Sequence, residues 1–247
     1  MRNVEAWQET KFERVSPGRW RAGRRNVPFT SRLVVDLAAE AYSQAIAVHA
    51  VGRLADLGCG RVPLFGMYRE HVTEVVCVDW PGSLQGSEYV DHFHDLNVPL
   101  ELEPGTFDTI IATDVVEHLH TPKVLFSSVQ RALRSGGKLI VGVPFLYWIH
   151  EEPRDFHRYT RFALGKMTED AGLDVISITA YAGAPEVMSD IAVKALGSRP
   201  RLARLIYVLT RAMLKLSLVK KLSEATKTSM PLGYVLVAQK PTGGDKN

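Results

Sequence analysis

LADLGCG, residues Leu54–Gly60, is an apolar segment that ends in a carboxylate and two glycines one residue apart. Glycines at such a turn let the backbone bend sharply and approach a ligand, because no Cβ stands in the way. The next strand-like segment, EVVCVD, ends in Asp79, whose carboxylate suits the two hydroxyls of a ribose. Open α/β sheets bind ligands at the carboxyl ends of their parallel strands. Asp56, Gly58, Gly60 and Asp79 therefore predict a ligand site at that edge of a sheet.

Apolar runs alternate with helical patterns on both sides of this motif. Such alternation predicts an α/β fold in which a mostly parallel sheet of seven strands carries helices on both faces. The last strand follows a long helical insertion, and an antiparallel place in the sheet is open to it. Residues 1–32 are basic and irregular, and the pair Gly136-Gly137 is expected to end a helix. We expect strands at 53–57, 74–79, 88–94, 107–113, 138–143, 174–180 and 233–239, and helices at 33–50, 122–134, 161–171 and over most of 185–230.

Length and composition are those of a soluble α/β domain. The chain has 247 residues, 46% of them hydrophobic and 23% charged, and a net charge of +3, which is too small to indicate nucleic acid. Its two cysteines form no disulfide framework, the N-terminus lacks the apolar core of a signal peptide, and no apolar run approaches a membrane span. A cytoplasmic location is therefore expected. We expect a single domain over 1–247, with a cap region (1–50), a cofactor-binding core (51–184), a helical insertion or lid (185–230) and the final strand (231–240).

Two classes of cofactor compete for the glycine turn. The dinucleotide fingerprint G-x-G-x-x-G would need a third glycine where this chain has Pro63, and no phosphate loop ending in Gly-Lys-Ser/Thr is present. Asp56, directly before the glycines, would also repel a pyrophosphate, whereas it suits a cation. S-adenosylmethionine carries an ammonium and a sulfonium and no phosphate, so the charge pattern favours it.

The order of motifs over roughly Leu54–Val143 resembles the class I S-adenosylmethionine-dependent methyltransferases with a D-x-G-C-G first motif. The resemblance implies a Rossmann-like fold, S-adenosylmethionine as cofactor and S-adenosylhomocysteine as product. It also implies that the glycine loop supports the methionine moiety, that Asp79 holds the ribose and that Asp95 lies beside the adenine. Val62 departs from the family, which often has a third glycine there. The implied cofactor-binding residues are Asp56, Gly58, Cys59, Gly60, Asp79, Trp80, Asp95, Leu96, Asp114 and Val115.

The segment PFLYWIHEEPRDFHRYT, residues Pro144–Thr160, follows the fifth expected strand and mixes aromatic, acidic, histidine and arginine side chains. Aromatic faces pack on sugar C–H surfaces, and charged groups bind hydroxyls, so the segment suits a polyhydroxylated acceptor. Its H-x-x-P-x-D-F-x-R-Y-T pattern resembles methyltransferases that act on cell-surface glycans. A polar loop of satisfied ion pairs is the simpler alternative. The candidate substrate-binding residues are Tyr147, Trp148, Glu152, Arg154, His157, Arg158 and Tyr159.

Methyl transfer to an alcohol needs a positioned nucleophile and a general base. We expect His150 to be this base, with Asp155 or Glu117 as alternatives. His118 is a further catalytic candidate, and a structural histidine at a helix N-terminus is an equally good interpretation of it. His150, Glu151, Asp155 and His157 could hold a metal, but their spacing fits no metal-site template, and no metal is predicted. The predicted function is O-methylation of a sugar, oligosaccharide or glycolipid. The alternatives are a lipid, quinone or other natural-product acceptor, or a noncatalytic protein that binds S-adenosylmethionine.

Between Ile191 and Ser223 the chain has eight Lys or Arg residues and no acid. Apolar residues at helical spacing make this stretch amphipathic, which favours peripheral contact with an anionic membrane through residues 199–222. A lid, a dimer contact or an ordinary core-covering helix are the alternatives. The sequence leaves the oligomeric state open and predicts no nucleic-acid partner, because it has no zinc ligands and no basic-aromatic repeat.

Overall fold

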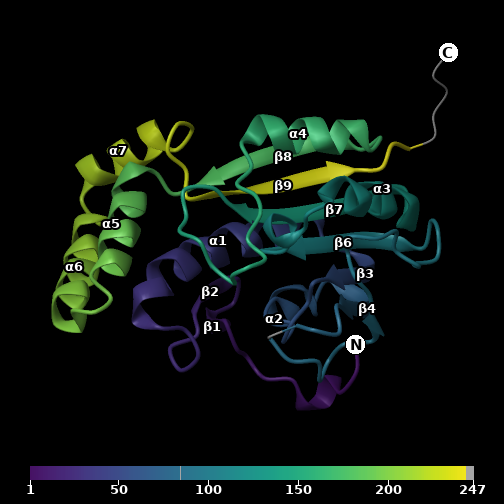
Figure 1. Ribbon diagram of the computed structural model, residues 1–247, viewed down its shortest axis with the longest axis horizontal. Helices are drawn as coiled ribbons and strands as arrows, with labels where there is room; N and C mark the ends of the chain where they lie inside the picture. The colour runs from purple at the N-terminus through teal and green to yellow at the C-terminus, as the bar shows by residue number, and fades with distance from the viewer. Residues whose placement is uncertain (84, 243–247) are drawn as a thin grey trace.

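The computed structural model describes residues 1–83 and 85–242 of the chain. Its main feature is a seven-stranded sheet with helices around it, which confirms the predicted Rossmann-like α/β class (Figure 1). The strands lie in the order β5-β4-β3-β6-β7-β9-β8. Their bounds are β3 (Gly52–Leu57), β4 (Val72–Asp79), β5 (His92–Phe93), β6 (Phe107–Thr113), β7 (Leu133–Pro144), β8 (Asp174–Tyr181) and β9 (Gly233–Gln239).

β3 is the first strand of this sheet along the chain, and later strands lie on both sides of it. β3 pairs in parallel with β4 on one side and with β6 on the other, so a crevice opens at the carboxyl ends of these strands. β5 and β7 extend the parallel part, while β9 runs antiparallel between β7 and β8. The last strand is thus antiparallel to both of its neighbours, which is the possibility that the sequence had left open.

Helices bury both faces of the sheet, because successive strand residues point to opposite sides. On one face, α3 (Pro122–Ala132) and α4 (Arg161–Asp170) pack with Ile110 and Leu139. On the other, Ile111 and Ile140 pack with α1 (Arg32–His49) and α2 (Phe65–Tyr68). α1 buries Val35, Ala38, Ala39, Tyr42 and Ile46, the one-face spacing that predicted this helix.

Three local expectations need correction. The third strand spans only His92–Phe93, because this edge strand pairs with just two residues of β4. α3 ends at Ala132 and not at 134, since Leu133 already pairs with Phe107 in the sheet. The N-terminal region is not irregular throughout: β1 (Phe12–Ser16) and β2 (Arg19–Ala22) form an antiparallel hairpin, and short turns of 3-10 helix, η1 (Val4–Ala6) and η2 (Phe29–Ser31), flank it.

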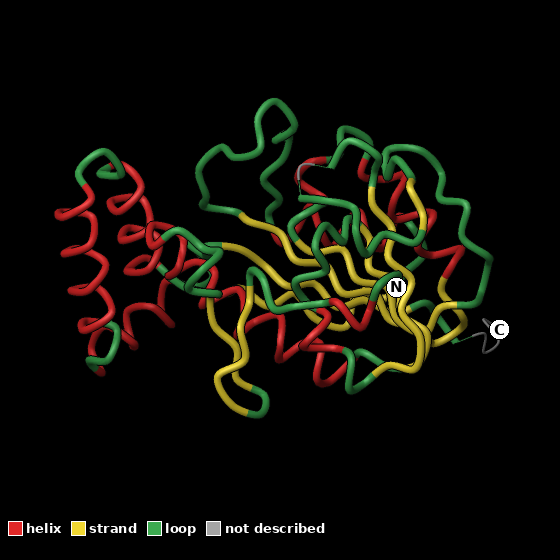
Figure 2. The backbone as a smooth tube through the Cα atoms, turned by 90° about the horizontal axis from the view of Figure 1, so that it is seen from below, coloured by secondary structure: helices red, strands yellow, loops and turns green. Residues whose placement is uncertain are grey.

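The insertion before the last strand forms a separate group of helices. α5 (Ala184–Ala195) packs against α6 (Pro200–Met213) and α7 (Ser217–Thr226), and the three stand beside one end of the sheet (Figures 1 and 2). We call α5–α7 the helical lobe. No helix in residues 1–83 and 85–242 is both long and apolar enough to cross a membrane.

Candidate active site

A cleft of about 530 Å³ opens at the carboxyl ends of β3, β4 and β6. It contains most of the residues that the sequence assigns to the cofactor. Three candidate acceptor-side residues, His118, Glu152 and Arg154, line it as well. The predicted cofactor residues that line the cleft are Gly58, Gly60, Asp79, Trp80, Asp95, Leu96, Asp114 and Val115.

The glycine turn is held in place by backbone hydrogen bonds. The Gly58 amide donates to the Val78 carbonyl oxygen at 2.8 Å. Gly58 has a φ of +69°, and a Cβ at this position would clash with the side chain of Val115, so no larger residue fits without moving the loop. Asp79 accepts hydrogen bonds from the amides of Gly60 and Trp80, both at 2.8 Å. Burial raises the pKa of Asp79 although these two amides oppose the shift.

Asp56 and Cys59 lie beneath the turn and do not line the cleft. The Asp56 carboxylate accepts a 3.0 Å hydrogen bond from the hydroxyl of Tyr68 on α2. Burial raises the pKa of Asp56 to about 7. A direct contact between Asp56 and the cofactor stays a prediction, whereas its role in supporting the turn is visible.

Asp114, at the end of β6, links three parts of the chain. Its carboxylate accepts hydrogen bonds from Lys11 before β1 and from the Tyr42 hydroxyl on α1, both at 2.6 Å. Its own φ is +54°, and Tyr42 reaches it across Gly142, where any Cβ would clash with the tyrosine ring. Burial opposes ionisation, but the Lys11 ammonium and the two hydrogen bonds hold the pKa of Asp114 below its usual range.

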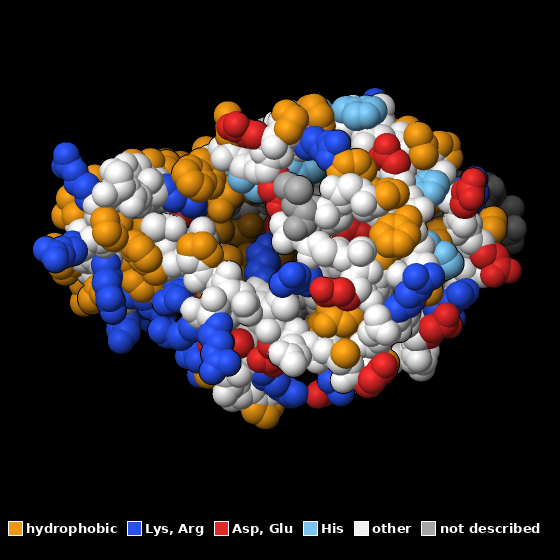
Figure 3. All heavy atoms as spheres, turned by 60° about the horizontal axis from the view of Figure 1, so that its bottom comes forward, with side chains coloured by type: hydrophobic (Ala, Val, Ile, Leu, Met, Phe, Trp, Pro, Cys, Tyr) orange, Lys and Arg blue, Asp and Glu red, His pale blue; other side chains and the backbone are white. Residues whose placement is uncertain are grey.

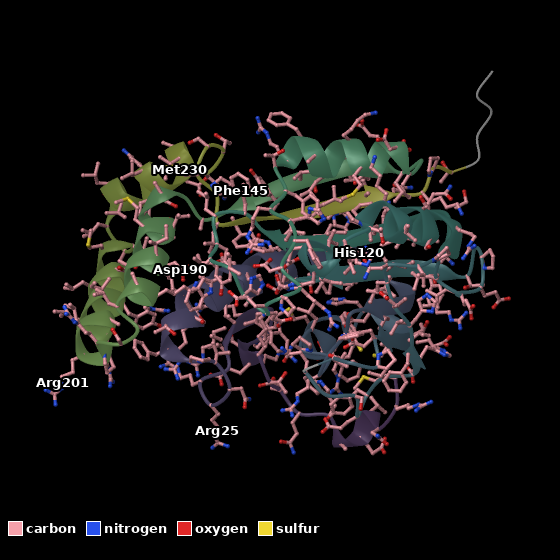
Figure 4. The ribbon with its side chains drawn as sticks, viewed as in Figure 1. Arg25, His120, Phe145, Asp190, Arg201 and Met230 are labelled. Atoms are coloured by element: carbon pink, nitrogen blue, oxygen red, sulfur yellow. The ribbon has the colours of Figure 1, made fainter. Side chains whose placement is uncertain are left out.

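The far end of the cleft is formed by the segment after β5. Asp95 is exposed, and both the backbone and the side-chain amide of Asn97 donate to it at 2.9 Å. The hydrogen bond from the Asn97 amide lowers the pKa of Asp95. The Asn97 side chain in turn accepts from the amide of His120, which Figure 4 labels on the segment after β6. Asp95 and Leu96 are thus presented at the rim by a loop that Asn97 ties down.

The segment Pro144–Thr160 closes over the other side of the cleft, and we call it the cover loop. Its Phe156 and His157 amides donate to the Glu117 carbonyl oxygen at 2.9 and 3.2 Å. The guanidinium of Arg154 lies 3.8 Å from the centre of the Trp80 ring, within cation–π range. Gln85 donates a 3.1 Å hydrogen bond to Glu151. The cover loop therefore spans from the end of β6 to the loop after β4.

Four of the predicted catalytic residues meet beneath the cover loop. Glu117 and His118 belong to η3 (Val116–His118), and His150 and Asp155 come from the loop itself. The Nε2 atoms of both histidines lie 3.8 Å from Oε1 of Glu117, and their rings are 4.8 Å apart. Asp155 Oδ2 lies 3.2 Å from Nδ1 of His150 and accepts a hydrogen bond from its backbone amide. Arg158 donates to both carboxylate oxygens of Asp155, at 2.5 and 2.7 Å.

The two acids of this cluster have pKa values shifted in opposite directions. Burial and the nearby Asp114 raise the pKa of Glu117 well above its usual range. Although burial alone would raise it, the Arg158 pair lowers the pKa of Asp155 to about 2. Burial and the adjacent His118 ring lower the pKa of His150. The pKa values of two neighbouring acids are thus shifted in opposite directions beside a histidine, which is the pattern of acid–base sites.

A model of the methyltransferase domain family matches residues 37–178, more than half of the chain. The chain belongs to this methyltransferase family. S-adenosylmethionine is its cofactor, and the cleft at the strand ends is lined by eight of the residues that the sequence assigns to it.

Solved structures agree with the fold of the methyltransferase. The [4+2]-cyclase SpnF is similar over 83% of this chain and 82% of its own, with 18% identity and a TM-score of 0.54. An S-adenosylmethionine-dependent methyltransferase from Mesorhizobium loti is similar over 82% and 97%, with 15% identity and a TM-score of 0.53. Phosphoethanolamine N-methyltransferase 2 from Haemonchus contortus is similar over 81% and 53%, with 17% identity and a TM-score of 0.50. The sequence matches no curated protein sequence.

Several candidate substrate residues of the methyltransferase lie away from the cleft. Tyr159 is buried and its hydroxyl donates to the Val116 carbonyl oxygen at 3.2 Å. Arg158 is engaged by Asp155, and the ring of Tyr147 lies 3.7 Å from the Lys194 ammonium of the helical lobe. Trp148, which is 54% exposed, and His157 do not line the cleft either. The cover loop is thus partly an ion-paired structure, as the simpler alternative held, and acceptor contacts by these five residues stay a prediction.

Several residues that shape the site could not be identified from the sequence. Lys11 and Tyr42 are separated from Asp114 by 103 and 72 positions, so no spacing relates them. Gln85 is in a short polar stretch after β4 that resembles an ordinary turn. Asn97 had a weak signal, because Asp-x-Asn is a common turn-forming pattern.

Proposed function

We propose that the methyltransferase transfers the methyl group of S-adenosylmethionine to a hydroxyl oxygen of a sugar, an oligosaccharide or a glycolipid. The observation that carries the proposal is the acid–base cluster of Glu117, His118, His150 and Asp155 beside the cofactor cleft. A neutral amine would not need such a group, because its lone pair attacks the methyl carbon before any proton is lost. An alcohol does need one, because its pKa lies far above neutral pH.

The transfer is an in-line displacement. The acceptor O–H bond breaks, its oxygen bonds to the methyl carbon, and the electron pair of the carbon–sulfur bond stays on sulfur, which gives S-adenosylhomocysteine. We expect His150 to take up the proton, since its lowered pKa keeps the ring neutral and able to accept one at pH 7. Asp155 fixes the orientation of the ring from the other side.

The sugar specificity is supported by the exposed groups of the cover loop. Glu152, Arg154 and Phe156 line the cleft next to Trp80. Together they offer aromatic faces for C–H surfaces and charged groups for hydroxyls. An acceptor that lies between them and the cofactor would meet His118 at the same edge of the cleft.

We also propose that residues 199–222 contact an anionic membrane. Among the residues of α6, all of which the structure describes, only Ala203 is buried. Leu205, Leu209 and Met213 form an exposed stripe, each slightly over half exposed. A second stripe is basic, with Arg201 and Arg204 on the helix and Lys215 just beyond it, while Arg211 pairs with Asp36 of α1. In Figure 3 the surface of the helical lobe, at the left, is mainly orange and blue, and in Figure 4 Arg201 lies at its outer end. Apolar and cationic stripes on one helix are typical of interfacial binding.

The membrane contact is tested by sedimentation with vesicles. We expect the protein to pellet with phosphatidylglycerol-containing vesicles and to stay in solution with phosphatidylcholine alone. Leu205→Asp with Leu209→Asp should abolish pelleting, whereas Val48→Asp, at an exposed apolar position on α1 outside the lobe, should not. Equal pelleting of the two variants would overturn the assignment.

A lipid-borne acceptor is the second candidate, and the exposed lobe is what favours it. Acceptor panels separate the two: methyl-labelled S-adenosylmethionine is incubated with sugars, oligosaccharides and glycolipids, and in parallel with quinones and phospholipids. The proposal expects labelled sugar or glycolipid that disappears in His150→Ala and persists in His71→Ala, an exposed histidine outside the site. Label only in quinone or lipid would support the second candidate. Cofactor binding without any product would instead indicate a noncatalytic protein.

A further inference from the structure

Glu117 has an unusual environment for a carboxylate. Its side chain is fully buried, and neither of its oxygens has a hydrogen-bond partner within the part of the chain that the structure describes. Buried polar groups are nearly always paired with protein, water or an ion, because an unpaired one loses its hydration without compensation. Two open carboxylate oxygens at the same buried point therefore indicate a missing partner.

The two histidines of the cluster both direct Nε2 toward this carboxylate. Each Nε2 is 3.8 Å from Oε1 of Glu117, and the ligand atoms of Glu117, His118 and His150 all lie within 4.8 Å of one another. A cation bound about 2.1 Å from each atom would hold neighbouring ligands about 3 Å apart. Each ligand atom would have to move by less than about 1 Å to reach that spacing, and rotation about side-chain torsions allows this.

The opposite nitrogen of each ring is already occupied. Nδ1 of His118 lies 2.6 Å from the Arg154 carbonyl oxygen. Nδ1 of His150 lies 3.2 Å from Asp155 Oδ2, with a guanidinium nitrogen of Arg158 at 3.4 Å. Metal-binding histidines commonly have a carbonyl or a carboxylate at their second nitrogen, which fixes the ring and leaves the first free for the metal. Both rings of this cluster follow that arrangement.

We propose that Glu117, His118 and His150 bind a divalent transition-metal cation. Two imidazole nitrogens with one carboxylate suit Zn²⁺, Co²⁺, Mn²⁺ or Fe²⁺ better than Mg²⁺, which prefers oxygen ligands. Glu151, whose Oε2 lies 3.9 Å from Nε2 of His118, is in reach as a fourth ligand. The set differs from the sequence-based candidates in that Glu117 and His118 replace Asp155 and His157, which no spacing rule links to His150.

The chemical role of this cation rests on the proposed function. His118 and Glu151 line the cofactor cleft, so open coordination positions would face the acceptor. The cation would lower the pKa of an acceptor hydroxyl bound to it, so that the proton leaves to solvent. His150 then serves as a ligand, and the proton uptake assigned to it above applies to the protein without metal. A vicinal diol, which can occupy two positions, is the class of acceptor that fits best.

The test is a calorimetric titration of the full chain, stripped with a chelator and dialysed, without cofactor or acceptor. Binding therefore reads out independently of methyl transfer, and a failed acceptor panel would leave its result intact. We expect one equivalent of Co²⁺ or Zn²⁺ to bind and Mg²⁺ to bind at least about 100-fold more weakly. Co²⁺ should also give the visible absorption bands of nitrogen and oxygen ligation.

Variants then assign the ligands. Glu117→Gln, which keeps the size of the side chain, and His150→Asn should each weaken Co²⁺ binding by about 100-fold or more, and Asp155→Asn by about 10-fold. His120→Gln, an exposed histidine two residues beyond His118, should bind as the wild type does. S-adenosylmethionine binding by Glu117→Gln checks that the variant is folded. Absence of stoichiometric binding, or binding that survives Glu117→Gln, would overturn the proposal.

Discussion

The glycine turn beneath the cofactor cleft and the cover loop above it are held by different kinds of contact. In the turn, backbone amides donate to the Val78 carbonyl and to Asp79. In the cover loop, side-chain pairs add to the backbone hydrogen bonds with Glu117: Arg158 pairs with Asp155 inside the loop, and Arg154 lies over Trp80 after β4. A turn held by its backbone tolerates few substitutions but binds one cofactor in one way. A loop held largely by side chains can change its contacts through substitutions that leave the turn unaltered.

The strongest test of the turn is its dependence on pH. The pKa of Asp56 is about 7 in the folded protein, against an ordinary value of 3.8. The unfolded chain therefore releases this proton first as pH rises, and the free energy of unfolding should fall by up to about 4 kcal/mol between about pH 4 and pH 7. Asp56→Asn, which still accepts from Tyr68, should remove this contribution in urea denaturation at a series of pH values.

Asp174→Asn, at an exposed acid at the start of β8, serves as the control and should follow the wild-type pH profile. Identical profiles for the wild type and Asp56→Asn would show that Asp56 is not held in its uncharged form beneath the turn.

Two glycines with the same backbone conformation differ in the space available for a Cβ. Gly58 and Gly18 both have φ of +69°, but a Cβ at Gly58 would clash with Val115, whereas one at Gly18 has nothing within 4 Å. Gly58→Ala should raise the Kd for S-adenosylmethionine about 100-fold, or about 3 kcal/mol. Gly18→Ala should cost about 1 kcal/mol of stability from backbone strain and leave the Kd unchanged. Calorimetry and urea denaturation separate the two effects, and equal Kd values for both variants would contradict the steric argument.

On the cover loop, breaking the Asp155 pair should loosen the loop and spare the turn. The side chain of Asp155 is only 2% exposed, so Asp155→Asn should lower the free energy of unfolding by about 2 kcal/mol and speed amide exchange over 145–158. The Kd for S-adenosylmethionine should stay within about threefold. Asp170→Asn removes the exposed pair with Lys166 on α4 and should change neither quantity measurably. A matching loss of stability in both variants would show that the cover loop does not depend on Asp155.

The smallest effect is expected where the two regions touch. Arg154→Ala removes the cation over Trp80 and should raise the Kd for S-adenosylmethionine about fivefold, or about 1 kcal/mol. Arg161→Ala removes a similar pair with Phe162 at 4.8 Å on α4, away from the cleft, and should leave the Kd unchanged. If Arg154→Ala also had no effect, the cover loop would not contribute to cofactor binding.

The same contrast explains how far the sequence predicted the molecule. The positions of most strands, the glycine turn and Asp79 follow from local patterns, since apolar alternation and glycine spacing act over a few residues. Lys11 and Tyr42 at Asp114 do not, because they depend on how segments far apart pack together. The hairpin β1–β2 was missed for a related reason: its strands, FERVS and RWRA, are short and largely polar.

The catalytic candidates lie between these cases. Glu117, His118, His150 and Asp155 were each identified by residue type, but their meeting at one buried point could not be foreseen. It depends on Phe156 and His157 binding the backbone of Glu117, which brings the cover loop onto η3. Cys59 and Asp56 are buried beneath the turn, which their place in the motif did not reveal, and their contact with the cofactor stays a prediction.

The decisive experiment is a crystal structure of the protein with S-adenosylhomocysteine. We expect the adenine beside Asp95 and Leu96, the ribose on Asp79, and the sulfur at the end of the cleft near Asp114. The side of the sulfur from which the methyl group is transferred should face Glu117, His118 and His150. A sulfur directed away from these three residues, or a ligand bound outside the cleft, would contradict it.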